Sequence, residues 1–367
     1  MRSTCTARAI PLLLLLLAPF EAAALRTGDV LVLDGQNNRV LRVDPSNGFV
    51  QIFSPRSGTN LLNTQPRSIA VDPVNGEIVV LNGNAPALVT IDPASGDQFA
   101  MPEASQGSLL LGAGPTGLAM SPRAPRFGSF RTLFVSEEGE VHEIDRSLLG
   151  ATATLLAPYP SQDEFDTGNF AAVRDPGGGN PLDVFVETSQ KILLHDGNAM
   201  SEWWTVPQTT LQGLGYDPVD QYGDDLYFSL QYTSCPSDYN GVYYFHLGGS
   251  LTPPQSGFGD ATAVQSGGNL ACPGPIALSS AAEPDVLFHP FPLFVVDTGQ
   301  IPPRIIEITQ PGVNHVAATL PDGSSATALA VYTPEPGTAE LALAAAAALA
   351  ALGRIRRRGA LKDFFEG

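Results

Sequence analysis

Basic residues are nearly absent from the body of this 367-residue chain. Residues 25–333 contain 12 Lys and Arg against 32 Asp and Glu, and Lys191 is the only lysine among them. Proteins that bind DNA or RNA gather Lys and Arg to neutralise phosphates. A net charge of −20, with no basic patch between the termini, therefore excludes nucleic acid as a partner and is compatible with weak binding of cations.

Cysteine and histidine are also scarce, which excludes several kinds of catalytic site. No His/Cys/Asp cluster has zinc-ligand spacing, and no Gly-x-Ser-x-Gly nucleophile elbow occurs. The sequence therefore assigns no catalytic residue, and a non-enzymatic role is expected. Three of the five histidines take related positions in one type of strand, where we expect structural roles: His142, His195 and His246.

Long apolar runs are confined to the two ends of the chain. Arg2 and Arg8 accompany an apolar segment at residues 10–20, and residues 22–24 are small alanines that suit signal peptidase. Residues 1–24 are therefore predicted to be a signal peptide that is cleaved after Ala24. The alternative is an uncleaved anchor, for which the apolar run is short.

The other end, residues 333–367, combines three features in order. Pro334, Glu335 and Pro336 precede an alanine-rich segment at residues 337–353, which favours a helix of about 25 Å, short of a hydrocarbon core of about 30 Å. A positive-inside stop follows. It consists of Arg354, Arg356, Arg357 and Arg358.

This order resembles the PEP-CTERM sorting signal of exported bacterial proteins. The resemblance implies transient insertion of the tail in the inner membrane until an exosortase-type protease removes it, and then a cell-surface or extracellular location. The nine residues after Arg358 depart from the pattern. A simple single-pass anchor, with one permanent transmembrane helix, is the alternative.

Three short apolar strands recur six times in fixed order between the two ends, bounded by Gly, Pro, Asp and Asn. The first type begins at Ser68, Gly117, Phe170, Gly213, Ile276 and Ala328. The second begins at Asp29, Glu77, Thr132, Leu182, Asp225 and Leu293. The third begins at Arg39, Ala87, Glu140, Lys191, Gly241 and Arg304, and a weaker fourth strand follows in most units, as at Phe49 and Glu202.

Six four-stranded units of about 40–65 residues predict an all-β fold, a six-bladed β-propeller over residues 25–332. The chain starts with a second-type strand and ends with a first-type strand, so the last strand is predicted to join the first blade and close the ring. Two separate β-sandwiches are the alternative. They would leave the fixed three-part order unexplained.

The first two units carry a resemblance to known propellers. GDVLVLDGQNNRVLRVDPSNG from Gly28 and PRSIAVDPVNGEIVVLN from Pro66 resemble NHL-type repeats. They are also similar to the wider class of SMP-30/gluconolactonase-like and streptogramin-lyase-like proteins. The resemblance implies the fold, and it adds a metal-dependent hydrolase or lyase as an alternative function.

A polar residue closes most second-type strands. If the strands alternate in direction, these residues form a ring on one face, which we call the polar ring. Related propeller hydrolases bind a divalent cation with such residues, and oxygen ligands suit calcium. Alternatively, these side chains cap the turns that follow. The members are Asp34, Asn82, Glu137, Glu187 and Asp297, with Gln231 or its neighbour in the fifth unit.

The same face is predicted to carry the longest loops and a disulfide. Cys235 and Cys272 lie in connections of neighbouring units that emerge on one face, so we predict a bond between them; two free thiols are the alternative. The loops from Pro158 and Tyr232 contain Tyr, Phe and Asp and are candidate ligand contacts. In the fourth unit Trp203 and Trp204 alternate along one strand, which predicts one buried indole and one at an edge.

These features together predict an exported β-propeller that binds a polysaccharide or protein partner at the cell envelope. Signal peptidase and an exosortase-type protease are the expected processing partners. The alternative is a metal-dependent hydrolase or lyase of SMP-30/gluconolactonase type. It requires three or four members of the polar ring to converge on the propeller axis.

Overall fold

The computed structural model describes residues 24–333 with internal gaps. The gaps are residues 56–58, 63–64, 74, 84–85, 102–114, 124–129, 138, 148–149, 161–170, 207–208, 218–224, 233–234, 236–237, 248–250, 252, 255–259, 267–269 and 280–291. The predicted signal peptide and sorting tail lie outside the described residues apart from Ala24 and Thr333, so both stay predictions. Within the described part, no helix has the length and apolar character needed to cross a membrane.

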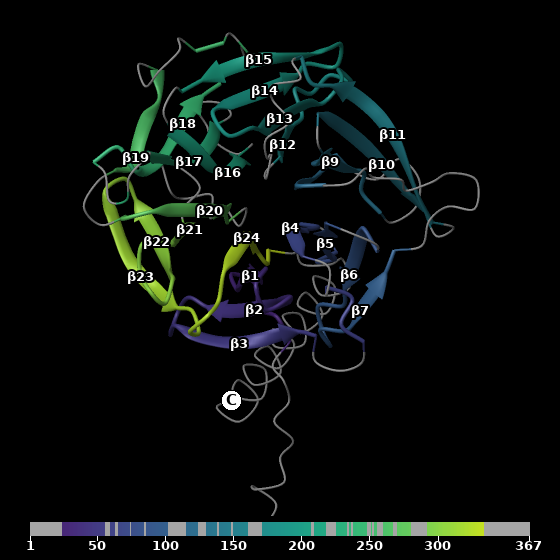
Figure 1. Cartoon of the computed structure of the whole chain (residues 1–367). Helices are drawn as coiled ribbons and strands as arrows, with labels where there is room; N and C mark the ends of the chain where they lie inside the picture. The colour runs from purple at the N-terminus through teal and green to yellow at the C-terminus, as the bar shows by residue number, and fades with distance from the viewer. Residues whose placement is uncertain are drawn as a thin grey trace, which may run out of the picture.

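Six four-stranded antiparallel sheets surround a central axis as the blades of a propeller (Figure 1). From the axis to the rim, blade 1 contains β24 (Ala326–Val331), β1 (Val30–Asp34), β2 (Arg39–Asp44) and β3 (Phe49–Ser54). In the same direction, blade 2 contains β4 (Pro66–Val71), β5 (Ile78–Asn82), β6 (Leu88–Ile91) and β7 (Gln98–Ala100). Blade 3 contains β8 (Gly117–Met120), β9 (Leu133–Glu137), β10 (Glu140–Ser147) and β11 (Gly150–Pro158).

The remaining three blades follow the same order. Blade 4 contains β12 (Ala171–Arg174), β13 (Asp183–Glu187), β14 (Lys191–His195) and β15 (Met200–Thr205). Blade 5 contains β16 (Thr209–Asp217), β17 (Asp225–Tyr232), β18 (Gly241–His246) and β19 (Thr262–Ser266). Blade 6 contains β20 (Pro273–Leu278), β21 (Leu293–Asp297), β22 (Arg304–Gln310) and β23 (Val313–Thr319). The predicted six-bladed propeller is confirmed.

The ring is closed by the last strand of the chain, as predicted. β24 pairs antiparallel with β1, from Val331 opposite Val30 to Ala328 opposite Leu33. Figure 1 shows the yellow C-terminal strand beside the purple N-terminal one, and consecutive innermost strands contact one another around the whole ring. Blade 1 is therefore built from both ends of the propeller domain.

The core lies between the blades. The position of the second strand in each blade explains why its sequence is so apolar. Side chains alternate between the two faces of a strand. Val30 and Val32 pack in one cluster with blade 6, whereas Leu31 and Leu33 pack in another with blade 2. Because both faces are covered, all five residues of β1 are buried.

Blade 4 corrects the expectation for its two tryptophans, since both indoles are buried. The register between β14 and β15 skips Trp203: Ile192 is opposite Trp204, and Leu193 is opposite Glu202. Such a bulge breaks the alternation of side chains. Both indole rings therefore contact Phe245 of blade 5, with ring centroids 5.2 and 4.8 Å away.

Candidate functional site

We call upper face the face that carries the connections between the second and third strands of each blade and between successive blades. Five of the six members of the polar ring are the last residues of β1, β5, β9, β13 and β21, so these five lie toward this face. All are buried. They belong to five different blades, and each lies one strand away from the innermost strand that borders the axis.

Two members of the polar ring have the same local role in neighbouring blades. Asp34 lies 2.9 Å from Arg39, and Asp297 lies 2.8 Å from Arg304, in both cases the first residue of the next strand. Each carboxylate also accepts a backbone N–H from the segment that leads into the innermost strand of its blade, at Ser325 or Cys272. These contacts hold the strand ends and turns of blades 1 and 6 together.

Asn82 occupies the equivalent position in blade 2. Its side-chain amide donates hydrogen bonds to the carbonyl oxygens of Leu61 and Pro86, both at 2.9 Å. The first links the end of β5 to the connection from blade 1, and the second closes the turn to β6. Asn82 therefore fastens the turns around its strand end.

Glu187 of blade 4 is a fully buried carboxyl group whose Oε2 atom forms no hydrogen bond in the described structure. Burial raises the pKa of this carboxyl well above its ordinary value. Removing a carboxylate from water disfavours its charged form. The structure therefore favours Glu187 in its neutral, protonated form.

Replacing this carboxyl with an amide is expected to stabilise the protein increasingly as the pH rises. Above the ordinary glutamate pKa of about 4.3, the unfolded chain releases a proton that folded Glu187 retains, so wild-type stability falls by about 1.4 kcal/mol per pH unit up to the raised pKa. Glu187→Gln removes this dependence. Urea unfolding between pH 4 and 9 measures it, with Asp322→Asn at an exposed position as the control. A pH-independent difference from wild type would contradict the assignment.

Glu137 belongs to the one set of three Asp, Glu, His or Cys side chains in the described residues whose ligand atoms lie within 4.8 Å of one another. Its companions are Glu140 and His142, from the same hairpin of blade 3. The polar ring as a whole does not form such a group. Glu137 raises the pKa of the His142 imidazole, against the opposing effect of burial.

The other two histidines considered with His142 lie at the opposite ends of their strands, toward the lower face. His195 is buried, and its Nδ1 accepts the backbone N–H of Gly197. His246 Nδ1 lies 2.9 Å from the buried Asp225 carboxylate. Sequence position within the third strand therefore did not distinguish His142, which has two carboxylates beside it.

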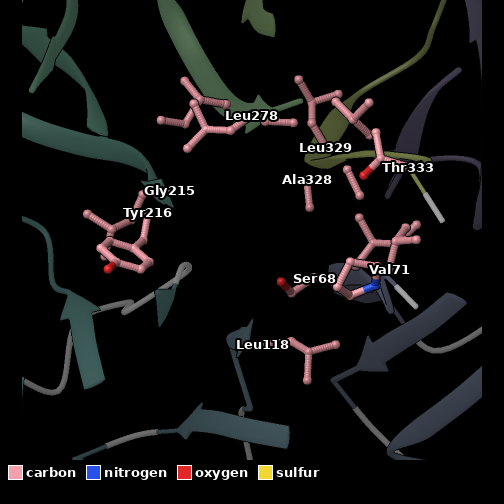
Figure 2. A pocket seen from close by; sticks show the side chains of 16 residues that line it. Ser68, Val71, Leu118, Gly215, Tyr216, Leu278, Ala328, Leu329 and Thr333 are labelled. Atoms are coloured by element: carbon pink, nitrogen blue, oxygen red, sulfur yellow. The ribbon is translucent and has the colours of Figure 1, made fainter. Parts of the chain in front are cut away.

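A cavity of about 270 Å³ occupies the axis of the propeller. Figure 2 shows the side chains around it, contributed by five of the six innermost strands. The lining is mainly aliphatic, with Ile69, Leu118 and Leu329 among its members, and its hydroxyl groups come from Ser68, Tyr216 and Thr333. None of the described lining residues is Asp, Glu or His, so the described part of the channel offers no carboxylate or imidazole to a metal ion.

The upper face of blades 5 and 6 carries a disulfide, the exposed side chains of Tyr239 and Ile301, and the half-buried Tyr232. Cys235 and Cys272 are joined, with Cα atoms 5.5 Å apart. The chain-entropy model gives such a loop of about 38 residues a stabilisation of about 3–4 kcal/mol. We call Tyr232, Tyr239, Ile301 and this disulfide the blade 5–6 surface.

Two loops of the blade 5–6 surface are held against the segment around Cys272. Asn240 donates to the Ala271 carbonyl at 2.6 Å and accepts the Tyr232 backbone N–H at 2.7 Å. The loop that carries Ile301 passes so close that a Cβ on Gly299 would lie 2.6 Å from the Ala271 side chain. The surface is therefore built on packed loops, and Gly299 permits their close approach.

Comparisons with known proteins find only distant structural likenesses. No family model matches the chain, and no curated protein matches its sequence. A calcium-binding protein, regucalcin, from Agrobacterium tumefaciens is 13% identical with a TM-score of 0.47, covering 73% of this chain and 78% of that one. A gluconolactonase from Xanthomonas campestris is 16% identical with a TM-score of 0.45, covering 82% and 88%. The PQQ-bound aldose sugar dehydrogenase from Streptomyces coelicolor is 13% identical with a TM-score of 0.43, covering 82% and 87%. At these values, none of them transfers an activity or a ligand to this chain.

Proposed function

We propose that the protein is an exported binding propeller that attaches to a neutral polysaccharide of the cell envelope through the blade 5–6 surface. The observation that carries the proposal is an exposed aromatic and aliphatic surface on cross-linked loops. Ile301 is 97% exposed and Tyr239 is 59% exposed, although the segments beneath them are packed and hydrogen bonded. Rigid loops lose little conformational freedom when they bind a ligand.

The chemistry of this surface fits a sugar polymer. The rings of Tyr232 and Tyr239 lie 5.7 Å apart and tilted by 46°, and aromatic faces of this kind pack against the apolar faces of sugar rings. Asp238 is exposed beside them and can accept hydrogen bonds from sugar hydroxyls. The net charge of −20 over residues 25–333 repels anionic polymers and favours a neutral one.

Export and sorting complete the proposal. Signal peptidase would release the chain after Ala24, and an exosortase-type protease would remove the tail from about Pro336 once the protein has crossed the inner membrane. The sequence patterns at the two ends support both steps. Intact mass of protein taken from its natural host measures both ends, and a stably membrane-bound chain ending at Gly367 would favour a permanent anchor instead.

Tyr239→Ala is expected to weaken polysaccharide binding about tenfold or more, as truncation of a central aromatic contact commonly does. Affinity electrophoresis in neutral polysaccharides and calorimetry with their oligosaccharides measure the loss. Phe99→Ala is a matched control, because Phe99 is 56% exposed but lies on the outer strand of blade 2. Equal losses in both variants would contradict the assignment of the surface. Binding to envelope fractions that protease treatment abolishes would instead identify a protein partner.

A metal-dependent hydrolase or lyase is the second candidate, and the acidic group around Glu137 is the observation that favours it. This function needs a cation within reach of a substrate, whereas the described channel lining has no carboxylate. Turnover of lactones and glycans by the full chain, with and without added divalent cations, separates the two candidates. Metal-dependent turnover that is abolished by Glu137→Gln would favour the hydrolase or lyase over the binding function.

A further inference from the structure

The hairpin between β9 and β10 brings two carboxylates and an imidazole together at one corner of blade 3. Glu137 and Glu140 are directly opposite each other in the antiparallel register, so their side chains leave the same face of the sheet. His142 lies two residues beyond Glu140 and therefore shares that face. Like charges opposite each other destabilise a strand pair unless a positive group lies between them.

The two distances from His142 are close to those between the ligands of one metal ion. His142 Nε2 lies 2.7 Å from the Glu137 carboxylate and 3.3 Å from that of Glu140. Ligand atoms about 2.0–2.2 Å from an ion are themselves about 2.8–3.6 Å apart in tetrahedral or octahedral geometry. All three ligand atoms lie within 4.8 Å of one another.

The orientation of His142 supports the same assignment. The residue is only 8% exposed, and its buried Nε2 is directed at the Glu137 and Glu140 carboxylates. A metal ion bound to the neutral imidazole takes the place of the proton that otherwise lies between Nε2 and Glu137.

We propose that Glu137, Glu140 and His142 bind one divalent transition-metal ion, with Zn²⁺ as the representative ion. A set of one imidazole and two carboxylates suits such ions, whereas Ca²⁺ takes six to eight oxygen ligands. The Glu140 side chain is 42% exposed, so the remaining coordination positions open to water. The site lies within blade 3 and shares only Glu137 with the polar ring for which the sequence predicted a divalent cation. It does not depend on the blade 5–6 surface.

Zinc binding by the full chain tests the proposal. After dialysis against a chelator and then chelator-free buffer, calorimetric titration with Zn²⁺ is expected to show one saturable site per chain. Glu140→Gln is expected to weaken that site at least about tenfold, in line with the losses seen when metal-site groups are removed. Glu143→Gln is the matched control, because Glu143 lies one residue from His142 on the opposite face of β10, and it is expected to leave zinc affinity unchanged.

Two further measurements make the outcome decisive. Co²⁺ bound to the wild-type chain is expected to show visible absorption bands that His142→Gln alters, and about a hundredfold excess of Ca²⁺ is expected not to displace Zn²⁺. If Glu137→Gln or His142→Gln fails to fold, the zinc affinity of Glu140→Gln decides the test, because the Glu140 side chain is partly exposed. The absence of a saturable zinc site, equal losses in Glu140→Gln and Glu143→Gln, or displacement by Ca²⁺ would each overturn the proposal.

Discussion

A chain that ends at Ser325 is expected to lose the cooperative propeller fold, whereas a chain that ends at Thr333 keeps it. The two chains differ only in residues 326–333, which contain β24, and both lack residues 334–367 of the predicted sorting tail. Without β24, blade 1 has three strands, and β1 becomes an open edge facing the axis. An exposed apolar edge strand promotes aggregation.

The size of this effect follows from what β24 contributes. Leu329 and Val331 are buried in the cluster between blades 1 and 6, and burial of each side chain is worth about 1.5–3 kcal/mol. Backbone bonds between Tyr332 and both Gly28 and Asp29 extend the pairing beyond the strand. The combined loss is comparable to the whole net stability of a domain, about 5–15 kcal/mol.

Size-exclusion chromatography, circular dichroism and urea unfolding distinguish the two chains. The shorter chain is expected to elute as aggregate and to unfold without a cooperative transition. A full-length Leu329→Asp variant buries an unpaired charge in the same strand. It is also expected to aggregate and to lose the cooperative unfolding transition. A monomeric, cooperatively unfolding chain that ends at Ser325 would show that β24 does not close the ring in solution.

The architecture could be predicted because the same pattern of buried strands is repeated in every blade. The second strand of a blade packs on both neighbouring blades, so runs such as Val30–Asp34 and Ile78–Asn82 are apolar almost throughout. Turn residues separate such runs at similar spacing. Closure by β24 could be predicted from the fixed order of strand types. The first unit lacks a first-type strand, and the chain ends with one that has no unit of its own.

The candidate site was harder to predict because side chains in a blade point toward the neighbouring blades. A polar residue at the end of a second strand therefore lies one strand away from the axis, and Asp34 and Asp297 contact an arginine of their own blade. The Glu137 group depends on a register in which Glu140 is opposite Glu137, and the bulge at Trp203 depends on a skipped pair. Neither register can be read from spacing alone.

The segment from Arg123 to Arg131 shows the same limit. The sequence presents it as an insertion between the first two strands of blade 3. In the structure its two ends reach in opposite directions: Arg123 pairs with Asp175 of blade 4, and Arg131 pairs with Asp72 of blade 2. Both acids belong to the Asp-Pro pairs that follow first-type strands, so the sequence pattern marked the two aspartates. No pattern marked the two arginines that pair with them.

Breaking the Arg131–Asp72 pair is expected to cost about 3–5 kcal/mol of unfolding free energy. Arg131 Nε lies 3.1 Å from Asp72 Oδ1, and both side chains are buried. The same guanidinium donates to the carbonyl oxygens of Ser121, Pro122 and Arg123, which fixes the connection between β8 and β9. Arg131→Met keeps an unbranched apolar stem but leaves the Asp72 carboxylate in the interface without this cation.

Urea unfolding at pH 7 of three variants isolates the buried charge. Arg123→Met is the matched control, because the Arg123–Asp175 pair is about a quarter to a third exposed and such surface pairs contribute about 0–1 kcal/mol. Arg131→Met combined with Asp72→Asn is expected to be more stable than Arg131→Met alone, since the second change removes the buried charge that has lost the Arg131 cation. If the Arg131 and Arg123 variants lose the same stability, blades 2 and 3 are not held together by this pair. If adding Asp72→Asn recovers none of the loss, the cost comes from the three carbonyl groups rather than from the buried carboxylate.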